Sequence, residues 1–176
     1  MILIGAGQLS QLLANLALSL DFAVTICDPR EEYADGWHVP NTQLRREMPD
    51  DVVMAVQPDA RTAVITLTHD PKLDDLALME ALKSPAFYVA ALGSRSNNRQ
   101  RRERLLSFDV TLDQVENLRG PAGLFIGSKT PSEIAVSIAA ELIAVKNGVE
   151  ANRLFNVNDA KTALDIAEDT LNSCRI

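Results

Sequence analysis

A glycine-rich turn follows the first apolar segment of the chain, residues 1–4, and leads into a helical pattern. Gly5 and Gly7 form the turn, and Gln8 and Ser10 come after it. A first glycine permits the tight turn, a second lets a phosphate approach the backbone, and the helix N-terminus offers free N–H groups with a partial positive charge. The spacing predicts an anion-binding turn of the dinucleotide-binding type, although Ser10 stands where Gly or Ala is usual.

A carboxylate follows the second apolar segment, residues 22–27. Asp28 comes 21 residues after Gly7, and the ribose-binding acid of dinucleotide folds lies about 20 residues after its turn. This spacing favours an unphosphorylated ribose, but Arg30 weakens that preference, because a nearby arginine can accommodate a 2′-phosphate. The alternative is a fold that keeps its glycines for the turn alone.

Polar side chains also follow the next strand candidate, residues 63–68. His69 and Asp70 stand directly after it, and a histidine beside a carboxylate can move a proton near neutral pH or bind a phosphate. The alternative is that Asp70 begins a turn before Pro71, while His69 is only solvated.

A second anion-binding point is predicted after residues 87–92. There Gly93 and Ser94 leave backbone N–H groups open at a helix start, and Arg95 adds a planar fork suited to phosphate or carboxylate. The other arginines of that helix are expected to form a solvated face with local partners such as Glu103. They are Arg99, Arg101, Arg102 and Arg104.

Small residues and a lysine precede the clearest helix start in the chain. Thr130 is predicted to be the N-cap, with Pro131 at the first helical position and Glu133 closing a capping box. Just before them, Gly127 and Lys129, with the serine between them, can close over a ligand from the opposite side. The same residues are also ordinary turn and capping material.

Alternating strand and helix patterns place these groups. After the glycine turn, leucine and alanine recur at helical spacing, at Leu9, Leu12, Leu13, Leu16, Ala17 and Leu20. Further helices are expected over about residues 50–56, 73–82, 97–107 and 130–147. The pattern predicts an α/β fold, a doubly wound Rossmann-like parallel sheet with helices on both faces and an extra C-terminal helix. In such a sheet, ligands bind outside the carboxyl ends of the strands.

Composition narrows the class of protein. The chain has 176 residues, 47% of them hydrophobic, and a formal net charge of −7, which argues against a general nucleic-acid surface. No apolar run approaches the roughly 18 residues of a membrane span, so a cytoplasmic protein without membrane contact is expected. Cys27 and Cys174 are far apart, and only His38 and His69 are present, so neither a disulfide framework nor a metal site is predicted.

Two regions are expected along the chain. Residues 1–148 are predicted to form the Rossmann-like ligand-binding domain. A C-terminal helical extension, residues 149–176, is expected to pack on that domain or on a partner chain. Its helix is indicated by a cap at Asn158 and Asp159, followed by apolar residues at helical spacing.

Taken together and in order, these motifs resemble the Rossmann domain of the XdhC/CoxI family. The resemblance covers about residues 1–148 and rests on the glycine turn, the Cys-Asp-Pro-Arg stretch at 27–30, Thr-His-Asp at 68–70, Leu-Gly-Ser-Arg at 92–95 and the segment 121–135. The glycine motif is common to many folds, but its combination with the later motifs is specific. Members are accessory factors for the maturation of molybdenum hydroxylases such as xanthine dehydrogenase and carbon monoxide dehydrogenase.

The resemblance implies a chaperone that binds molybdenum cofactor (molybdopterin), or a nucleotide-bearing form of it, assists its sulfuration and delivers it to an apo-dehydrogenase. The implied partners are that apo-enzyme and a sulfur-donating protein, with a homodimer as a further option. Longer members carry an N-terminal domain with a functional cysteine, whereas this sequence begins at the Rossmann strand, and residues 149–176 extend past the usual family ending. The cofactor, a pterin with a phosphate, would suit the glycine turn and Arg95.

Two other functions stay open on the residues alone. An NAD(P)-dependent oxidoreductase would use Asp28 for the ribose and His69 as acid or base, although a substrate domain or a Tyr/Lys catalytic pair is not evident. A nucleotide-sensing regulatory module would use the same turn. All these hypotheses share one cofactor-binding rim, formed by Gly5, Gly7, Gln8, Ser10, Asp28, Arg30, His69, Asp70, Gly93, Ser94, Arg95, Gly127, Lys129 and Thr130.

Overall fold

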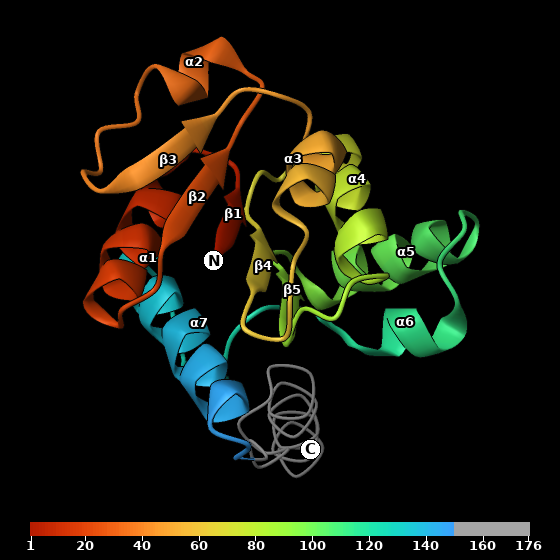
Figure 1. The fold of residues 1–176 in the computed structure, drawn as a ribbon. Coiled ribbons are helices and arrows are strands. Elements are labelled where there is room, and N and C mark those ends of the chain that lie inside the picture. Colours follow the sequence, from red (N-terminus) through yellow and green to blue (C-terminus); the bar gives the residue numbers. More distant parts are fainter. Residues whose placement is uncertain (150–176) are drawn as a thin grey trace, which may run out of the picture.

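A six-stranded sheet with the order β3-β2-β1-β4-β5-β6 forms the centre of the molecule (Figure 1). The computed structural model describes residues 1–149. All neighbouring strands run parallel, and this order is that of the doubly wound Rossmann fold. The strands are β1 (Ile2–Ile4), β2 (Val24–Cys27), β3 (Thr42–Arg45), β4 (Ala63–Thr66), β5 (Tyr88–Ala91) and β6 (Leu118–Arg119).

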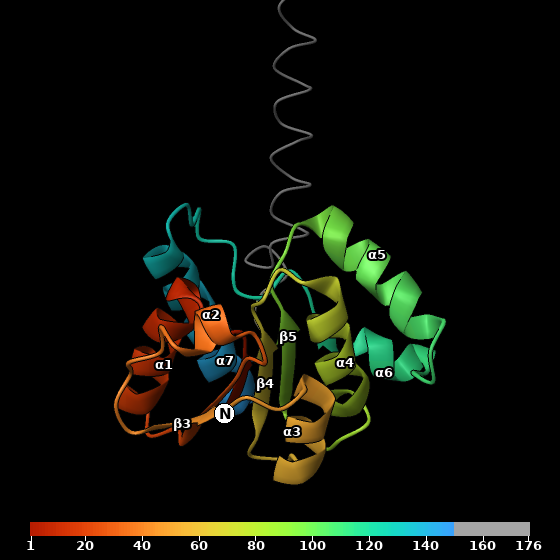
Figure 2. The ribbon, with the colours of Figure 1, turned by 90° about the horizontal axis from the view of Figure 1, so that it is seen from above.

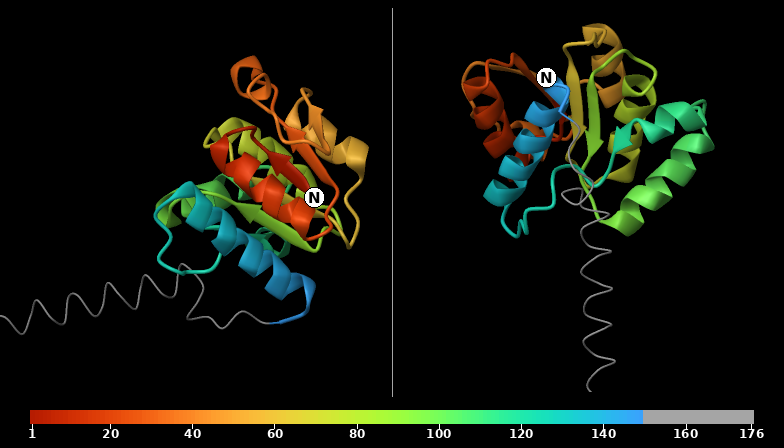
Figure 3. Two further views of the ribbon diagram at one scale, coloured as in Figure 1. Left: turned by 90° about the vertical axis from the view of Figure 1, so that its left-hand side faces the viewer. Right: turned by 90° about the horizontal axis from the view of Figure 1, so that it is seen from below.

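Helices cover both faces of the sheet, which confirms the predicted fold class (Figures 2 and 3). One core lies between the sheet and the pair α1 and α7, and the other lies between the sheet and α3, α4, α5 and α6. The helices are α1 (Gln8–Ser19), α2 (Glu31–Ala34), α3 (Pro49–Val56), α4 (Pro71–Ala81), α5 (Arg95–Leu106), α6 (Leu112–Glu116) and α7 (Pro131–Lys146).

The two cores explain why the inner strands are continuous apolar runs. Along β1, Leu3 packs into the core under α1 and α7, while Ile2 and Ile4 pack into the core under α3 and α4. All three side chains are buried, because a parallel strand covered on both faces has no solvent side.

Within residues 1–149, the structure confirms the helices expected from the sequence and adds elements that the sequence did not indicate. The helix near residues 50–56 is present as α3, and the predicted capping box closes α7: Glu133 N donates to Thr130 Oγ1 at 3.3 Å, and Thr130 N donates to Glu133 Oε2 at 2.9 Å. The edge strands β3 and β6 and the short helices α2 and α6 were not predicted, because β3 is mostly polar and only partly buried, while the other three have five residues or fewer.

The predicted C-terminal helical extension lies outside the described residues from 150 onward. Within residues 1–149, no helix combines the length and the apolar character needed to cross a membrane.

A buried hydrogen bond ties α7 to the sheet and to the loop after β6. Tyr88 Oη donates to Glu141 Oε2 at 2.6 Å, and Gly123 N donates to the same oxygen at 2.9 Å. Tyr88 and Glu141 are 1% and 2% exposed. Burial and the neighbouring Glu141 carboxylate both raise the pKa of Tyr88 well above its usual value, so the phenol remains a hydrogen-bond donor at neutral pH.

Replacing Tyr88 by Phe is expected to lower the free energy of unfolding by about 2 kcal/mol, because the buried Glu141 carboxylate then loses a donor. Urea denaturation followed by far-UV circular dichroism measures this change. Tyr33→Phe is the matched control, since Tyr33 is 42% exposed, and should change stability by less than about 0.5 kcal/mol. Equal effects of the two variants would contradict the structural role of the Tyr88 hydroxyl.

Candidate ligand-binding site

The carboxyl ends of β1 and β4 mark the point where the chain changes sides of the sheet. β1 leads into α1 on one face, and β4 leads into α4 on the other (Figure 2). In an open α/β sheet the crevice between two such diverging loops is where ligands bind. The loops here are residues 5–7 and 67–70, and they contain four of the residues predicted for the rim: Gly5, Gly7, His69 and Asp70.

The two glycines of the turn differ in whether the structure leaves room for a side chain. Gly5 has φ +105°, and a Cβ at this position would lie 3.0–3.1 Å from the side chain and backbone of Thr68. Gly7 has φ −81°, an ordinary value, and a Cβ there would meet nothing within 4 Å. Gly5 is therefore required by the close approach of the two loops, whereas the space beside Gly7 is open.

The N-terminus of α1 is left without a side-chain cap. Gly7 is the N-cap, no side chain accepts a hydrogen bond from the first turn, and that turn contains no acidic residue. The free N–H groups and the helix dipole therefore favour an anion at this end. Gln8 is exposed there, while Ser10 is 1% exposed and its hydroxyl has no partner among the described residues. Ser10 thus fits the packed position where Gly or Ala is usual.

Gly5→Ala is expected to cost about 3 kcal/mol of stability, because it adds backbone strain and a clash with Thr68. Gly7→Ala should cost no more than about 1 kcal/mol, since only an N-cap preference is lost. Urea denaturation of both variants measures the difference. Similar losses would mean that the turn is held by something other than the Gly5–Thr68 approach.

Asp28 is fully buried and its carboxylate is used inside the fold. Oδ2 accepts hydrogen bonds from Ala6 N at 2.8 Å and Arg30 Nη2 at 2.9 Å, and Oδ1 accepts from Arg30 N at 3.1 Å and Arg30 Nε at 2.9 Å. Burial alone would raise the pKa of Asp28, but the hydrogen bonds from Arg30 and Ala6 outweigh it and hold the pKa below its usual value. The acid that was predicted to face a ribose thus anchors the glycine turn to β2.

In the loop after β4, Asp70 begins a turn, which is the second of the two interpretations that the sequence left open. Lys72 N donates to Asp70 Oδ1 at 2.9 Å, so Asp70 is the N-cap of α4. Asp70 N donates to Thr68 Oγ1 at 2.9 Å, which fixes the loop. His69 lies between them with φ +62° and an exposed side chain, so its ring is available at the rim.

The loop after β5 contains the residues of the second predicted anion-binding point, Gly93, Ser94 and Arg95. Ser94 Oγ accepts from Asn97 N at 3.1 Å and caps α5, so this hydroxyl is engaged by the helix. Arg95 is the first residue of α5. Asn98 Nδ2 donates to the carbonyl oxygens of Gly93 and Ser94 at 3.1 and 3.2 Å, which fixes the loop from inside.

The arginines of α5 do not form the solvated face that the sequence suggested. Arg101 is 5% exposed, and its Nη2 lies 3.0 Å from Oδ2 of the buried Asp74. Arg104 Nε donates to Asp75 Oδ2 at 2.6 Å, and Arg102 donates to the carbonyls of Val115 and Leu118. That prediction was wrong because the acidic partners lie on α4, far back in the sequence; Arg99 alone among the four is exposed.

The buried ion pair between Asp74 and Arg101 joins the loops after β4 and β5. Asp74 Oδ1 accepts from Thr68 Oγ1 at 2.7 Å, while Arg101 Nη1 donates to Leu92 O at 3.0 Å. Burial raises the pKa of Asp74, opposed by the hydrogen bonds from Thr68 and the charge of Arg101. Thr68, Asp74 and Arg101 are positioning residues that the sequence analysis missed; the signal was an acidic pair on one helix and an arginine run on another.

The loop of residues 121–130 continues from β6 along the same end of the sheet. Ala122 N donates to Ala91 O, the last carbonyl of β5, at 3.0 Å. A small hollow of about 140 Å³ lies between this loop, Leu92 and the start of α7. Gly127 is exposed and lines this hollow, and the exposed Lys129 stands two residues further along the loop. The backbone N–H of Lys129 already donates to Glu133 Oε2 at 2.6 Å. The backbone N–H of Lys129 is therefore part of the helix cap, whereas its side chain is not.

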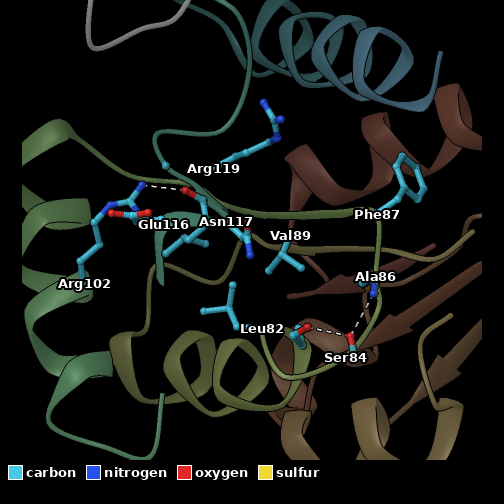
Figure 4. Close-up of a pocket in the computed structure, with 12 residues that line it drawn as sticks. Leu82, Ser84, Ala86, Phe87, Val89, Arg102, Glu116, Asn117 and Arg119 are labelled. Carbon is cyan, nitrogen blue, oxygen red and sulfur yellow. Dashed lines mark hydrogen bonds between the residues drawn. The ribbon is translucent and has the colours of Figure 1, made fainter. Parts of the chain in front are cut away.

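A larger hollow has a volume of about 520 Å³, and Figure 4 shows the side chains that line it. It is bordered by the end of α4, the segment before β5, and β6. Arg102 and Arg119 are its basic side chains, and both are held by the fold: Arg102 binds backbone carbonyls, and Arg119 lies 3.4 Å from Glu141 Oε1. None of the predicted rim residues lines this hollow.

Cys27 ends β2 and is fully buried. Burial, together with the nearby carboxylates of Asp28 and Glu47, raises its pKa to about 12. A thiol with this pKa is almost wholly protonated near neutral pH and is a poor nucleophile. Cys27 is therefore unsuited to carrying sulfur. Within residues 1–149, no three His, Cys, Asp or Glu side chains gather as metal ligands.

Cys27 is expected to resist alkylation by iodoacetamide at pH 8 in the folded protein and to react once the protein is unfolded in urea. A Cys174→Ser background leaves Cys27 as the only thiol of the chain, and mass spectrometry measures the adduct. Rapid labelling of the folded protein would contradict the buried, protonated state.

The sheet order and the glycine turn that leads into α1 define a Rossmann-type domain. Residues 1–142 match the family model described as the XdhC Rossmann domain, and the chain belongs to that family. This confirms the resemblance found in the sequence.

Three relatives extend this comparison. The chain is 32% identical over 150 residues to a probable xanthine dehydrogenase subunit of Bacillus subtilis (strain 168), covering 85% of this chain and 43% of the relative. It is 30% identical over 151 residues to YqeB of Escherichia coli (strain K12), covering 84% and 27%. It is 30% identical over 92 residues to the molybdenum cofactor insertion chaperone PaoD of the same organism, covering 52% and 29%.

A solved structure shares the fold. A crystal structure described as a xanthine dehydrogenase from Bacillus halodurans has a TM-score of 0.71 and 27% identity, covering 85% of this chain and 43% of that one. The chain thus spans less than half the length of each of these relatives.

Proposed function

We propose that this chain is an accessory factor in the maturation of a molybdenum hydroxylase, which binds molybdenum cofactor at the carboxyl-end rim and delivers it to the apo-enzyme. Two kinds of finding support this role. The chain belongs to the XdhC family, and one of its relatives is named a molybdenum cofactor insertion chaperone while another is named as part of a probable xanthine dehydrogenase.

The observation that carries the proposal is the open space at Gly7. The two loops at the switch point need a glycine at position 5 but not at position 7, and the helix that starts there has no side-chain cap. A phosphate can therefore approach the first turn of α1 closely, as at other helix N-termini that bind anions. We assign the phosphate of the pterin to the backbone N–H groups after Gly7.

Further groups of the rim can hold the rest of such a cargo. Arg95 begins α5 beside Gly93 and Ser94, and its guanidinium suits an anionic group. His69 and the Lys129 side chain are exposed at the neighbouring loops. Cys27 is buried and protonated, so we assign to the described residues of this chain the binding and orientation of the cargo and not the supply of sulfur.

Delivery requires contact with a second protein. The implied partners are the apo-hydroxylase and a sulfur donor, and a second copy of this chain is a further candidate. Ile126 and Val136, each 50% exposed, and Ile143, 37% exposed, are apolar side chains on the last loop and on α7 that can take part in such a contact.

Gly7→Val is expected to lower the pterin content of the purified protein at least tenfold, because the branched side chain fills the space at the start of α1. The full chain is expressed in cells that make molybdenum cofactor and purified without oxygen, and the bound pterin is oxidised and measured by fluorescence. Thermal unfolding shows whether the variant is folded.

Ser19→Val places the same side chain at the other, exposed end of α1 and should keep its pterin. Undiminished pterin in Gly7→Val would remove the glycine turn from the site. Absence of pterin from the natural sequence, together with turnover of a nicotinamide substrate, would overturn the proposed function.

A further inference from the structure

The carboxylate of Asp28 is saturated by its own chain. A carboxylate offers about four lone-pair positions, and both oxygens of Asp28 accept two hydrogen bonds each, one from Ala6 N and three from Arg30. The side chain is 0% exposed. No acceptor position is left for a hydroxyl group of a ligand.

This saturation matters because of where Asp28 stands. It directly follows β2, beside the glycine turn, where the acid of a dinucleotide fold accepts hydrogen bonds from the ribose hydroxyls. The guanidinium of Arg30 occupies those positions here, with Nε on one oxygen and Nη2 on the other, both at 2.9 Å. Such a bidentate, charge-assisted pair is among the stronger hydrogen-bonded contacts in proteins.

A second contact holds Arg30 in place. Its guanidinium carbon lies 4.0 Å from the centre of the Tyr33 ring, within the range of a cation–π interaction. The Arg30 side chain is 22% exposed, so it closes the Asp28 site from the solvent side. Displacing it would also leave the buried Asp28 carboxylate without its counter-ion, which is costly in an interior.

We infer that Arg30 is a specificity-determining residue that fills the ribose subsite and so selects a ligand that ends at its phosphate over one that carries a ribose diol. This inference rests on the proposed function, in which the phosphate lies at α1. Of the cofactor forms, it favours the pterin monophosphate over a dinucleotide whose ribose would lie beside β2.

Titration calorimetry on the full chain tests this with three probes: inorganic pyrophosphate, NAD and NADP. In the natural sequence, NAD should bind no more tightly than pyrophosphate, because the ribose finds no acceptor. In Arg30→Ala, which frees two acceptor positions on Asp28, NAD binding should tighten at least tenfold while pyrophosphate binding stays the same.

Arg61→Ala is the matched control, since it removes the same charge from a side chain that is 92% exposed, and it should leave all three affinities unchanged. Arg30→Gln, which keeps one donor for Asp28, should give a smaller gain and covers the case in which Arg30→Ala fails to fold. Circular dichroism checks each variant.

Three outcomes would overturn the inference. In the first, NAD binds the protein of natural sequence at least tenfold more tightly than pyrophosphate does. In the second, NADP binds it more tightly than NAD, which would mean that Arg30 recognises a 2′-phosphate. In the third, the affinity for NAD rises in neither Arg30 variant. A failure of the proposed function looks different. If pyrophosphate binds no variant while NAD still gains from the loss of Arg30, the phosphate site at α1 is wrong and the role of Arg30 stands.

Discussion

The close approach of Gly5 to Thr68 sets how the two halves of the sheet meet. A Cβ at position 5 would not fit against Thr68. Because glycine has none, the loops after β1 and β4 can approach closely, with the two strands paired and their helices on opposite faces of the sheet. Thr68 is held in turn by Asp74, and Asp74 by Arg101. One steric contact and one buried ion pair thus fix three of the loops that form the rim.

The rim itself separates groups that hold the fold from groups left for a ligand. Asp28, Asp70 and Ser94 stand at strand ends, yet each is bound by backbone or side-chain groups of its own neighbourhood. What the fold leaves open is backbone: the first turn of α1 after Gly7. Binding by main-chain N–H groups would suit the proposed carrier role, because it uses no reactive side chain of the protein and leaves the ligand chemically unchanged.

The sequence predicted features that depend on local pattern and failed where partners lie far apart. The glycine turn and the Thr130 capping box are encoded within a few residues and were recognised. The burial of Arg101 depends on Asp74, twenty-seven residues earlier, and the saturation of Asp28 depends on Ala6; neither pairing has a periodic signal. The edge strand β3 was missed because it is mostly polar and only partly buried, so it shows no apolar run.

The internal use of arginine has a consequence for how the chain meets an anion. The chain has 17 basic against 24 acidic residues, and Arg30 and Arg101 are neutralised by carboxylates within the fold. The long-range electrostatic field of the molecule therefore repels anions. Attraction by helix-end dipoles acts only at short range. At physiological ionic strength the Debye length is about 8 Å, and added salt shortens it and so weakens the repulsion. Added salt should therefore speed the association of an anionic ligand with the protein.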